Sequence, residues 1–265
     1  MAKKKSTGRK SRKRRQVNWQ EVKAWVLLVI IGLVLYFLAR PVVEEWTAGP
    51  GAGAKVPSGH WQYGIDLSHH NGGRIEWDSL FVMTDRNGYT VRDLADAVDV
   101  QPVRFVFIKA TEGVTHKDTR FADNWKEAGK RALSRGAYHY YRPNKDPGAQ
   151  ARHFIKTVGS LKYRDLPPVL DIETFHAGGS KEKLNADLRI WLETVGTYYG
   201  KRPIVYTYES FARDYLDKDI LSDYPVWIAH YEVNRPRRAG WDYWQFTDRA
   251  VVHGVHGHVD MSVTK

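Results

Sequence analysis

Short apolar runs rich in Val, Ile, Tyr and Phe recur from His60 to the C-terminus, between longer stretches of helical or loop character. Runs of this length, bounded by Gly and Pro, are typical of buried β-strands. Eight of them are present, at residues 62–68, 104–110, 136–142, 167–173, 202–208, 224–230, 242–248 and 258–263. Helices are expected between several of these runs, at residues 119–134, 147–161, 181–199 and 210–216.

Strands that alternate with helices predict a parallel sheet covered by helices. Eight such strands predict an α/β fold, an irregular TIM-like (β/α) barrel. The last strands follow one another after short connections, so the helix ring is expected to be incomplete. The barrel domain is expected to cover residues 60–265 and to be preceded by one N-terminal transmembrane helix.

The N-terminal region has the charge pattern of a membrane anchor. Residues 1–23 carry ten lysines and arginines against Glu21 alone, within a formal net charge of +11 for the chain. Residues 24–39 carry no charge and would form a helix about 24 Å long, and Val42 and Val43 extend the apolar stretch toward the roughly 30 Å of a hydrocarbon core. We expect a basic cytoplasmic tail at residues 1–23 and a signal-anchor helix at 24–43, with the N-terminus cytoplasmic.

Two other interpretations of the apolar run are a cleaved signal peptide and a buried core helix. The run is followed by Arg-Pro-Val-Val-Glu-Glu-Trp, a poor cleavage site, and it has no polar face. Residues 44–59, rich in Gly, Pro and Ala, predict a flexible linker. A basic tail can also bind nucleic acid, but its position beside an apolar span favours a membrane surface, so no nucleic-acid partner is expected.

The segment Pro168-Val-Leu-Asp171-Ile-Glu173 places two carboxylates two residues apart at the end of an apolar run. On a strand these side chains point to the same side. Like charges held together out of water raise one pKa, which leaves a carboxylic acid that can protonate a glycosidic oxygen. Asp and Glu at a strand end can equally cap a loop or pair with Arg. Asp66 and Asp260 also end apolar runs, and the first and last strands of a closed barrel are neighbours.

The sequence gives no sign of a metal or cofactor site. Without cysteine, disulfides and cysteine-based zinc sites are excluded. No His-Glu-x-x-His is present. Histidines stand close together at two places in the sequence, and we interpret them as solvated or hydrogen-bonded loop residues: His69 and His70, and His253, His256 and His258.

Five segments, in this order, closely resemble glycoside hydrolase family 25, the lysozymes that cut peptidoglycan. They are Tyr63-Gly-Ile-Asp66-Leu-Ser-His-His-Asn71-Gly, Phe105-Val-Phe-Ile-Lys109-Ala-Thr-Glu112-Gly113, Gly136-Ala-Tyr-His139-Tyr-Tyr, Leu170-Asp171-Ile-Glu173 and Trp244-Gln245-Phe. Each segment alone is a weak signal, whereas the ordered set is specific. The resemblance covers about residues 60–265 and implies an irregular α/β barrel.

The resemblance implies cleavage of the β-1,4 bond between N-acetylmuramic acid and N-acetylglucosamine, with peptidoglycan glycan strands as the binding partner. Glu173 is similar to the general acid, Asp66 and Asp171 to the flanking carboxylates, and Asp260 to a late acidic residue. Asp171 would stabilise positive charge at the anomeric centre or orient the acetamido group of the substrate. The positions similar to those that shape the sugar groove are Lys109, Glu112, Tyr138, Tyr140, Tyr206, Trp227 and Gln245.

The chain departs from the family pattern at Ser262, where Asn is common, and at an insertion around residues 84–99. Together with the anchor, the resemblance predicts a single-pass protein of a bacterial cytoplasmic membrane whose catalytic domain faces the cell wall. The alternative is a membrane-tethered peptidoglycan-binding protein with little or no activity.

Overall fold

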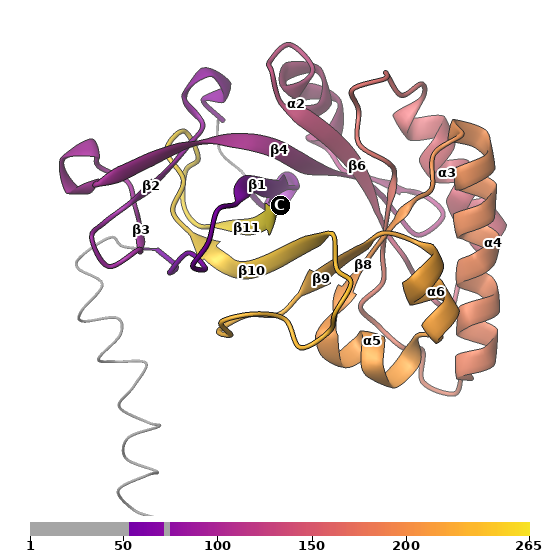
Figure 1. The fold of residues 1–265 in the computed structure, drawn as a ribbon. Coiled ribbons are helices and arrows are strands. Elements are labelled where there is room, and N and C mark those ends of the chain that lie inside the picture. The colour runs from indigo at the N-terminus through magenta and orange to yellow at the C-terminus, as the bar shows by residue number, and fades with distance from the viewer. Residues whose placement is uncertain (1–52, 72–74) are drawn as a thin grey trace, which may run out of the picture. The chain divides into compact units, whose positions relative to one another are not determined.

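Eight strands close into a barrel in the computed structural model, which describes residues 53–71 and 75–265 (Figure 1). In barrel order they are β1 (Gln62–Leu67), β4 (Asp99–Glu112), β6 (Ser134–Tyr140), β7 (Val169–Asp171), β8 (Ile204–Tyr208), β9 (Val226–Ala229), β10 (Tyr243–Ala250) and β11 (Val259–Thr264). The ring closes because β1 pairs with β4 on one side and with β11 on the other. Each of the eight expected strands is therefore present.

The direction of the last strand differs from the expectation of a wholly parallel sheet. Neighbours from β1 through β4 and on to β10 are parallel. β11 is antiparallel to both of its neighbours, β10 and β1. The chain between β10 and β11 contains no helix, and a short connection returns a strand in the opposite direction, whereas a parallel return needs a crossover of a dozen or more residues.

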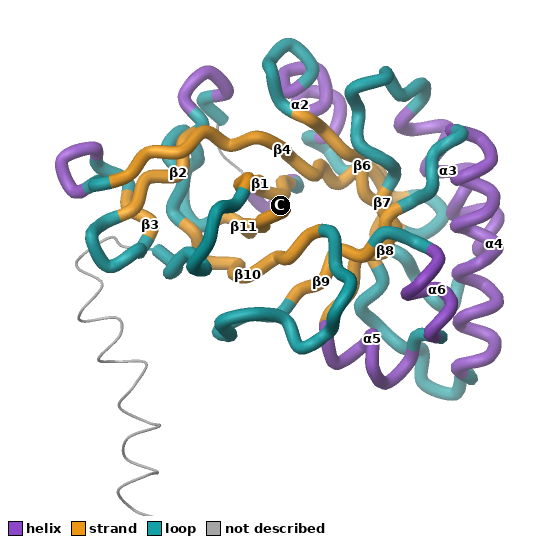
Figure 2. Tube along the Cα trace, in the orientation of Figure 1, coloured by secondary structure: helices purple, strands orange, loops and turns teal. Residues whose placement is uncertain are grey.

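The helices surround only part of the barrel. They are α2 (Phe121–Ala128), α3 (Pro147–Val158), α4 (Lys181–Tyr199), α5 (Glu209–Tyr215) and α6 (Lys218–Asp223). Figures 1 and 2 show α3 to α6 grouped beside β6 to β9, with the region of β10 and β11 left without a covering helix. The predicted incomplete ring is confirmed in the described residues, and the predicted helices are present, with α6 added.

Short strands and turns lie outside the eight barrel strands. The insertion around residues 84–99 forms a hairpin of β2 (Phe81–Thr84) and β3 (Thr90–Val91), and β2 pairs with the first part of β4. The short strand β5 (His116–Lys117) pairs with the end of β4. Three 3-10 turns complete the described elements: His69–Asn71, Trp77–Ser79 and Leu94–Asp96.

The N-terminal predictions fall mostly on residues that the structure does not describe. The basic tail (1–23), the transmembrane helix (24–43) and the linker up to residue 52 lie outside the described residues, and they stay predictions. Of the helices at residues 53–71 and 75–265, none is long and apolar enough to cross a membrane. Gly53 and Val56 donate backbone hydrogen bonds to Thr90 and Gly88, so the end of the predicted linker pairs with the hairpin of β2 and β3.

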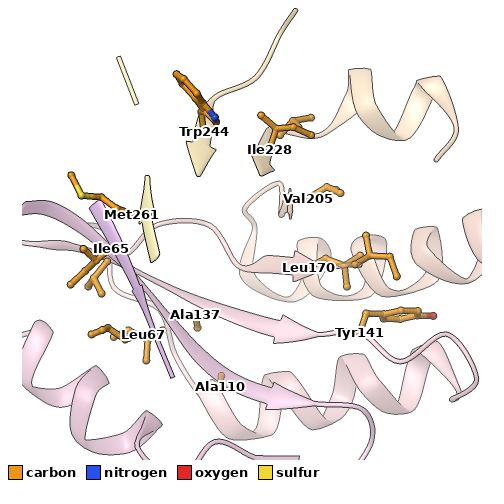
Figure 3. Close-up of a cluster of buried hydrophobic side chains, with 14 of the residues drawn as sticks. Ile65, Leu67, Ala110, Ala137, Tyr141, Leu170, Val205, Ile228, Trp244 and Met261 are labelled. Carbon is orange, nitrogen blue, oxygen red and sulfur yellow. The ribbon is translucent and has the colours of Figure 1, made fainter. Parts of the chain in front are cut away.

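Alternate residues of each strand build the core that surrounds the barrel. Every barrel strand sends apolar side chains outward, and Figure 3 shows these residues around the strands. The labelled residues are Ile65, Leu67, Ala110, Ala137, Tyr141, Leu170, Val205, Ile228, Trp244 and Met261. The helices cover part of this layer through buried residues such as Phe154 of α3 and Trp191 of α4. The period of two along the strands thus separates an outer core from an inner one.

A cluster of aromatic side chains fills part of the barrel interior. Phe107 stacks on Trp227 with ring centroids 4.3 Å apart, and Tyr243 meets Phe105 and Phe107 edge to face at 5.3 Å. Glycines on neighbouring strands, which lack a side chain, leave space for these rings. A methyl group on Gly64 would overlap the Phe105 ring.

We predict that Gly64→Ala lowers the free energy of unfolding by about 1–3 kcal/mol, because the added methyl group overpacks the barrel interior. Gly148→Ala is the control: this glycine lies in α3, where a methyl group meets the flexible end of Arg152 and, at ordinary contact distance, the Asp146 carboxylate, and alanine favours a helix. Thermal unfolding of the full-length variants checks both. Equal stability of Gly64→Ala and the wild type would contradict this account of the interior.

Candidate active site

Four carboxylates meet at the end of the barrel where the parallel strands terminate. Asp66 lies near the end of β1, and Asp171 is the last residue of β7. Asp260 pairs with Asp66 in the register of β1 and β11, because the antiparallel β11 begins at this end. The charge of Asp171 acts on Asp66, and that of Asp260 acts on Glu173, so the two pairs share one site. The structure therefore brings together the four acidic residues that the sequence singled out.

Glu173 reaches this site from beyond the strand. The sequence suggested that both acids lie on one strand, but β7 ends at Asp171, and Glu173 belongs to the loop that follows. The intervening Ile172 is fully buried and donates its backbone N–H to the carbonyl of Tyr206, 3.0 Å away. The chain stays anchored to β8 past the end of the strand, and this anchor keeps Glu173 on the same side as Asp171.

Gln245 of β10 connects two walls of the site. Its Oε1 accepts hydrogen bonds from the hydroxyls of Tyr206, at 2.8 Å, and Tyr231, at 2.6 Å. These two donors fix the orientation of the amide, so its Nε2 faces Asp66 and donates to Oδ2 over 2.9 Å. Gln245 is thus a buried positioning residue for Asp66.

Asp66 and Asp260 form one pair of carboxyls with raised pKa values. Burial raises the pKa of Asp66 well above its usual value, and the negative charge of Asp260 raises it further. Burial also raises the pKa of Asp260, but its hydrogen bond with Asp66 opposes that rise. Two carboxyls held together in this way favour a state in which the pair keeps one proton over a state in which both are ionised.

Asp171 and Glu173 form a second pair with raised pKa values. Burial raises the pKa of Asp171 well above its usual value, and the charge of Glu173 adds to this effect. Burial raises the pKa of Glu173 as well. The nearby hydroxyls of Tyr208, Tyr206 and Tyr140 oppose the second shift, because they favour the ionised carboxylate. A pair of this kind retains one proton at a pH at which two isolated carboxyls would both be ionised.

Two cations lie on the β4 and β6 side of the site. Lys109 of β4 donates to Glu112 over 2.8 Å, and Arg142, just past β6, donates to the same carboxylate over 2.9 Å. Both cations face the Tyr140 ring, with centroid distances of 5.0 Å for Lys109 and 4.7 Å for Arg142. Burial of Glu112 opposes its ionisation, but the two cations lower its pKa to about 2. Glu112 therefore stays ionised and holds the two cations beside Asp171.

A buried hydrogen-bond chain outside the barrel supports this wall. The Thr111 hydroxyl lies 2.7 Å from Nδ1 of His139, and Nε2 of His139 lies 3.1 Å from Oε1 of Gln150. Burial lowers the pKa of His139 to about 3, so the ring is neutral. His139 points away from the carboxylates, although it follows the same pattern of polar strand ends as Asp171. Its role is to fix Gln150, which in turn holds the loop after β6.

Some residues expected to shape a sugar groove are buried in the barrel interior instead. Trp227 and Tyr206 are almost fully buried, and the Trp227 indole donates to Ser262 over 3.0 Å. Ser262, the departure from the family pattern, thus supports the barrel filling. Tyr138 is also turned inward, among the partly buried residues of the aromatic cluster. Tyr140 and Glu112 are likewise only partly buried.

Sequence reasoning did not select Tyr231 and Arg142 as site residues. Arg142 follows Tyr140 by two positions, so strand alternation would have placed it on the same side. Tyr231 follows β9 in a loop and carried no comparable signal. Within residues 53–71 and 75–265, no group of three or more His, Cys, Asp or Glu side chains is arranged to hold a metal ion.

Comparison with known proteins agrees with this geometry. The sequence model of Glycosyl hydrolases family 25 matches residues 65–255. The protein YegX of Escherichia coli (strain K12) is 36% identical over 211 residues, which are 79% of this chain and 71% of that protein. Lysozyme M1 of Streptomyces globisporus is 32% identical over 231 residues, covering 82% of this chain and 70% of that protein.

Solved structures share the barrel. A bacterial lysozyme from Streptomyces coelicolor superposes with a TM-score of 0.66 and 29% sequence identity, over 78% of this chain and 94% of that one. A family 25 glycosyl hydrolase from Bacillus anthracis gives a TM-score of 0.63 and 27% identity, over 80% and 94% of the two chains. The family model covers more than two thirds of the chain, and the barrel carries the acidic residues in the expected places: the chain belongs to glycosyl hydrolase family 25.

Proposed function

We propose that the protein is a lysozyme that hydrolyses the β-1,4 bond between N-acetylmuramic acid and N-acetylglucosamine in peptidoglycan. The observation that carries the proposal is the meeting of Asp66, Asp171, Glu173 and Asp260 at one end of a family 25 barrel. Relatives named as lysozymes support the choice of substrate. A glycosidic bond needs one carboxylic acid and one carboxylate, and the pair of Asp171 and Glu173 supplies both while it retains a single proton.

In this proposal Glu173 protonates the leaving oxygen and Asp171 faces the anomeric centre. The developing positive charge favours the ionised form of Asp171, which leaves the proton of the pair on Glu173 until it is transferred. Oδ1 of Asp171 is buried and has no hydrogen-bond partner among the described residues, so no neighbouring donor stabilises the charged form of Asp171 at this oxygen. Asp66 and Asp260 keep a nearby negative charge fixed, and Gln245 sets its position.

A tethered peptidoglycan-binding protein with little activity is the competing function. Such a protein has no use for carboxyls with raised pKa values, because burying them costs folding stability. Retention of both carboxyl pairs therefore favours the enzyme. Binding to peptidoglycan without release of reducing ends would support the alternative.

We also propose that the enzyme is held at a bacterial cytoplasmic membrane and faces the cell wall. The support is the sequence of residues 1–43, a basic segment followed by an uncharged apolar run. Fractionation of cells producing the full-length chain tests this proposal. Retention of the intact chain in the membrane, with the C-terminus open to external protease, is the expected result, and a shorter soluble product would show cleavage.

We predict that Glu173→Gln lowers kcat on purified peptidoglycan roughly 10²–10⁴-fold, because the amide cannot donate the catalytic proton. The measurement is reducing-end release, with mass analysis of the products for reducing N-acetylmuramic acid. Glu193→Gln, an exposed site on α4, is the matched control and should retain wild-type activity. Full activity of Glu173→Gln would exclude this residue as the acid.

We predict that activity declines on the alkaline side as the pair of Asp171 and Glu173 loses its proton. Burial raises the pKa of Glu173 and the Tyr208 hydroxyl lowers it, so Tyr208→Phe should raise this pKa further. A higher pKa keeps Glu173 protonated to a higher pH, and the alkaline limb of kcat/KM should therefore move upward. An unchanged or downward-shifted limb in the pH profile would rule out this role for Tyr208.

A further inference from the structure

A cavity of about 380 Å³ lies between the loop that follows β6 and the loop that follows β7. The first loop contributes Pro143, Lys145 and Asp146, and the second contributes Phe175. The start of α4 completes the lining, which includes Lys183 and Asp187. None of the residues expected to catalyse the reaction or to shape the sugar groove lines this cavity.

The cavity adjoins the carboxylate site through both of its loops. Pro143 follows directly after Arg142, which binds Glu112 on the β6 side of the site. Phe175 stands two residues after Glu173. Since β6 and β7 are parallel neighbours, both loops leave the barrel at the end where the carboxylates meet. A ligand bound at the carboxylates can therefore extend a substituent into the cavity.

The walls of the cavity are fixed in place. Gln150 of α3 donates from Nε2 to the carbonyls of Arg142 and Lys145, at 3.1 and 3.2 Å, and so holds the first loop. Phe175 of the second loop stacks on Tyr215, with ring centroids 4.7 Å apart. A cavity with walls held this way needs little reordering to take up a ligand.

One buried polar group near the cavity, although not part of its lining, has no hydrogen-bond partner among the described residues. The Tyr141 side chain is fully buried, and its hydroxyl forms no hydrogen bond with any described residue. Burial raises the pKa of Tyr141, and so do the charges of Asp187 and Asp146, which both line the cavity. Figure 3 shows the hydroxyl directed away from the labelled core residues of β1 and β4. The charges of Asp187 and Asp146 thus act on a buried group behind the cavity wall.

The lining combines apolar contact surface with charges of both signs. Pro143 and Phe175 supply the apolar part, and the charged residues are Lys145, Asp146, Lys183 and Asp187. A peptide with carboxylates and an amino group carries charges that can match both signs, whereas the hydroxyls of a sugar ring are uncharged. We propose that this cavity binds the charged peptide substituent that a peptidoglycan strand carries beside the bond to be cut. The inference rests on the proposed function and adds a second recognition element to it.

The test compares two substrates made from one peptidoglycan preparation: intact material, and glycan strands freed of peptide by an amidase. For the full-length protein we expect Lys145→Glu to raise KM roughly fivefold on peptide-bearing strands, with kcat unchanged, because one favourable charge becomes repulsive. On peptide-free strands the variant should equal the wild type. Lys156→Glu makes the same charge change at an exposed position of α3 outside the cavity, and it should match the wild type on both substrates.

Equal KM values for Lys145→Glu and the wild type on peptide-bearing strands would overturn the inference, and so would an equal loss on both substrates. A wild type that cleaves neither substrate would refute the proposed lysozyme activity instead. In that case, calorimetric binding of a synthetic tetrapeptide with two carboxylates and one amine still decides the question. Binding that Lys145→Glu weakens and Lys156→Glu does not would support the cavity, and no binding by the wild type would refute it.

Discussion

The aromatic filling of the barrel is the constraint on which the active site depends. Phe105, Phe107, Trp227 and Tyr243 close the interior below the carboxylates, and glycines in the neighbouring strands leave room for the rings. A closed floor keeps water away from one side of Asp66 and Asp171, which are both buried. Burial then disfavours their charged forms. The packing that stabilises the fold is thus also what supplies protonated carboxyls to the site.

Each carboxylate pair is positioned by neighbouring side chains, through hydrogen bonds at Asp66 and through nearby charges at Asp171. Gln245 aligns Asp66 because two tyrosine hydroxyls occupy its oxygen and leave its N–H groups for the carboxylate. Lys109 and Arg142 approach Asp171, but Glu112 binds both and limits their effect on it. This balance keeps the pKa of Asp171 raised while cations stand nearby. Substitution of Glu112 would therefore disturb the proton held by the catalytic pair.

The strands and the acidic residues could be predicted because they leave local signals. Each barrel strand is a short apolar run, and Asp171 follows such a run directly. The direction of β11 could not be predicted from its own residues, because parallel and antiparallel strands share the same composition. His139 also stands near the end of an apolar run, but strand alternation sends it outward to Thr111 and Gln150. The orientation of β11 matters for function, since it brings Asp260 beside Asp66.

The sequence by itself determined the family, the number of barrel strands and the identity of the four acids, because motif order and apolar periodicity are properties of the chain. Only the tertiary structure decided which residues serve the site together. Tyr231 and Gln245, Arg142 and Glu112, and Phe175 and Tyr215 are partners drawn from different strands and loops. The protonation of the carboxyls was decided there as well, because a pKa depends on burial and on neighbouring charges, and both arise only when distant segments meet.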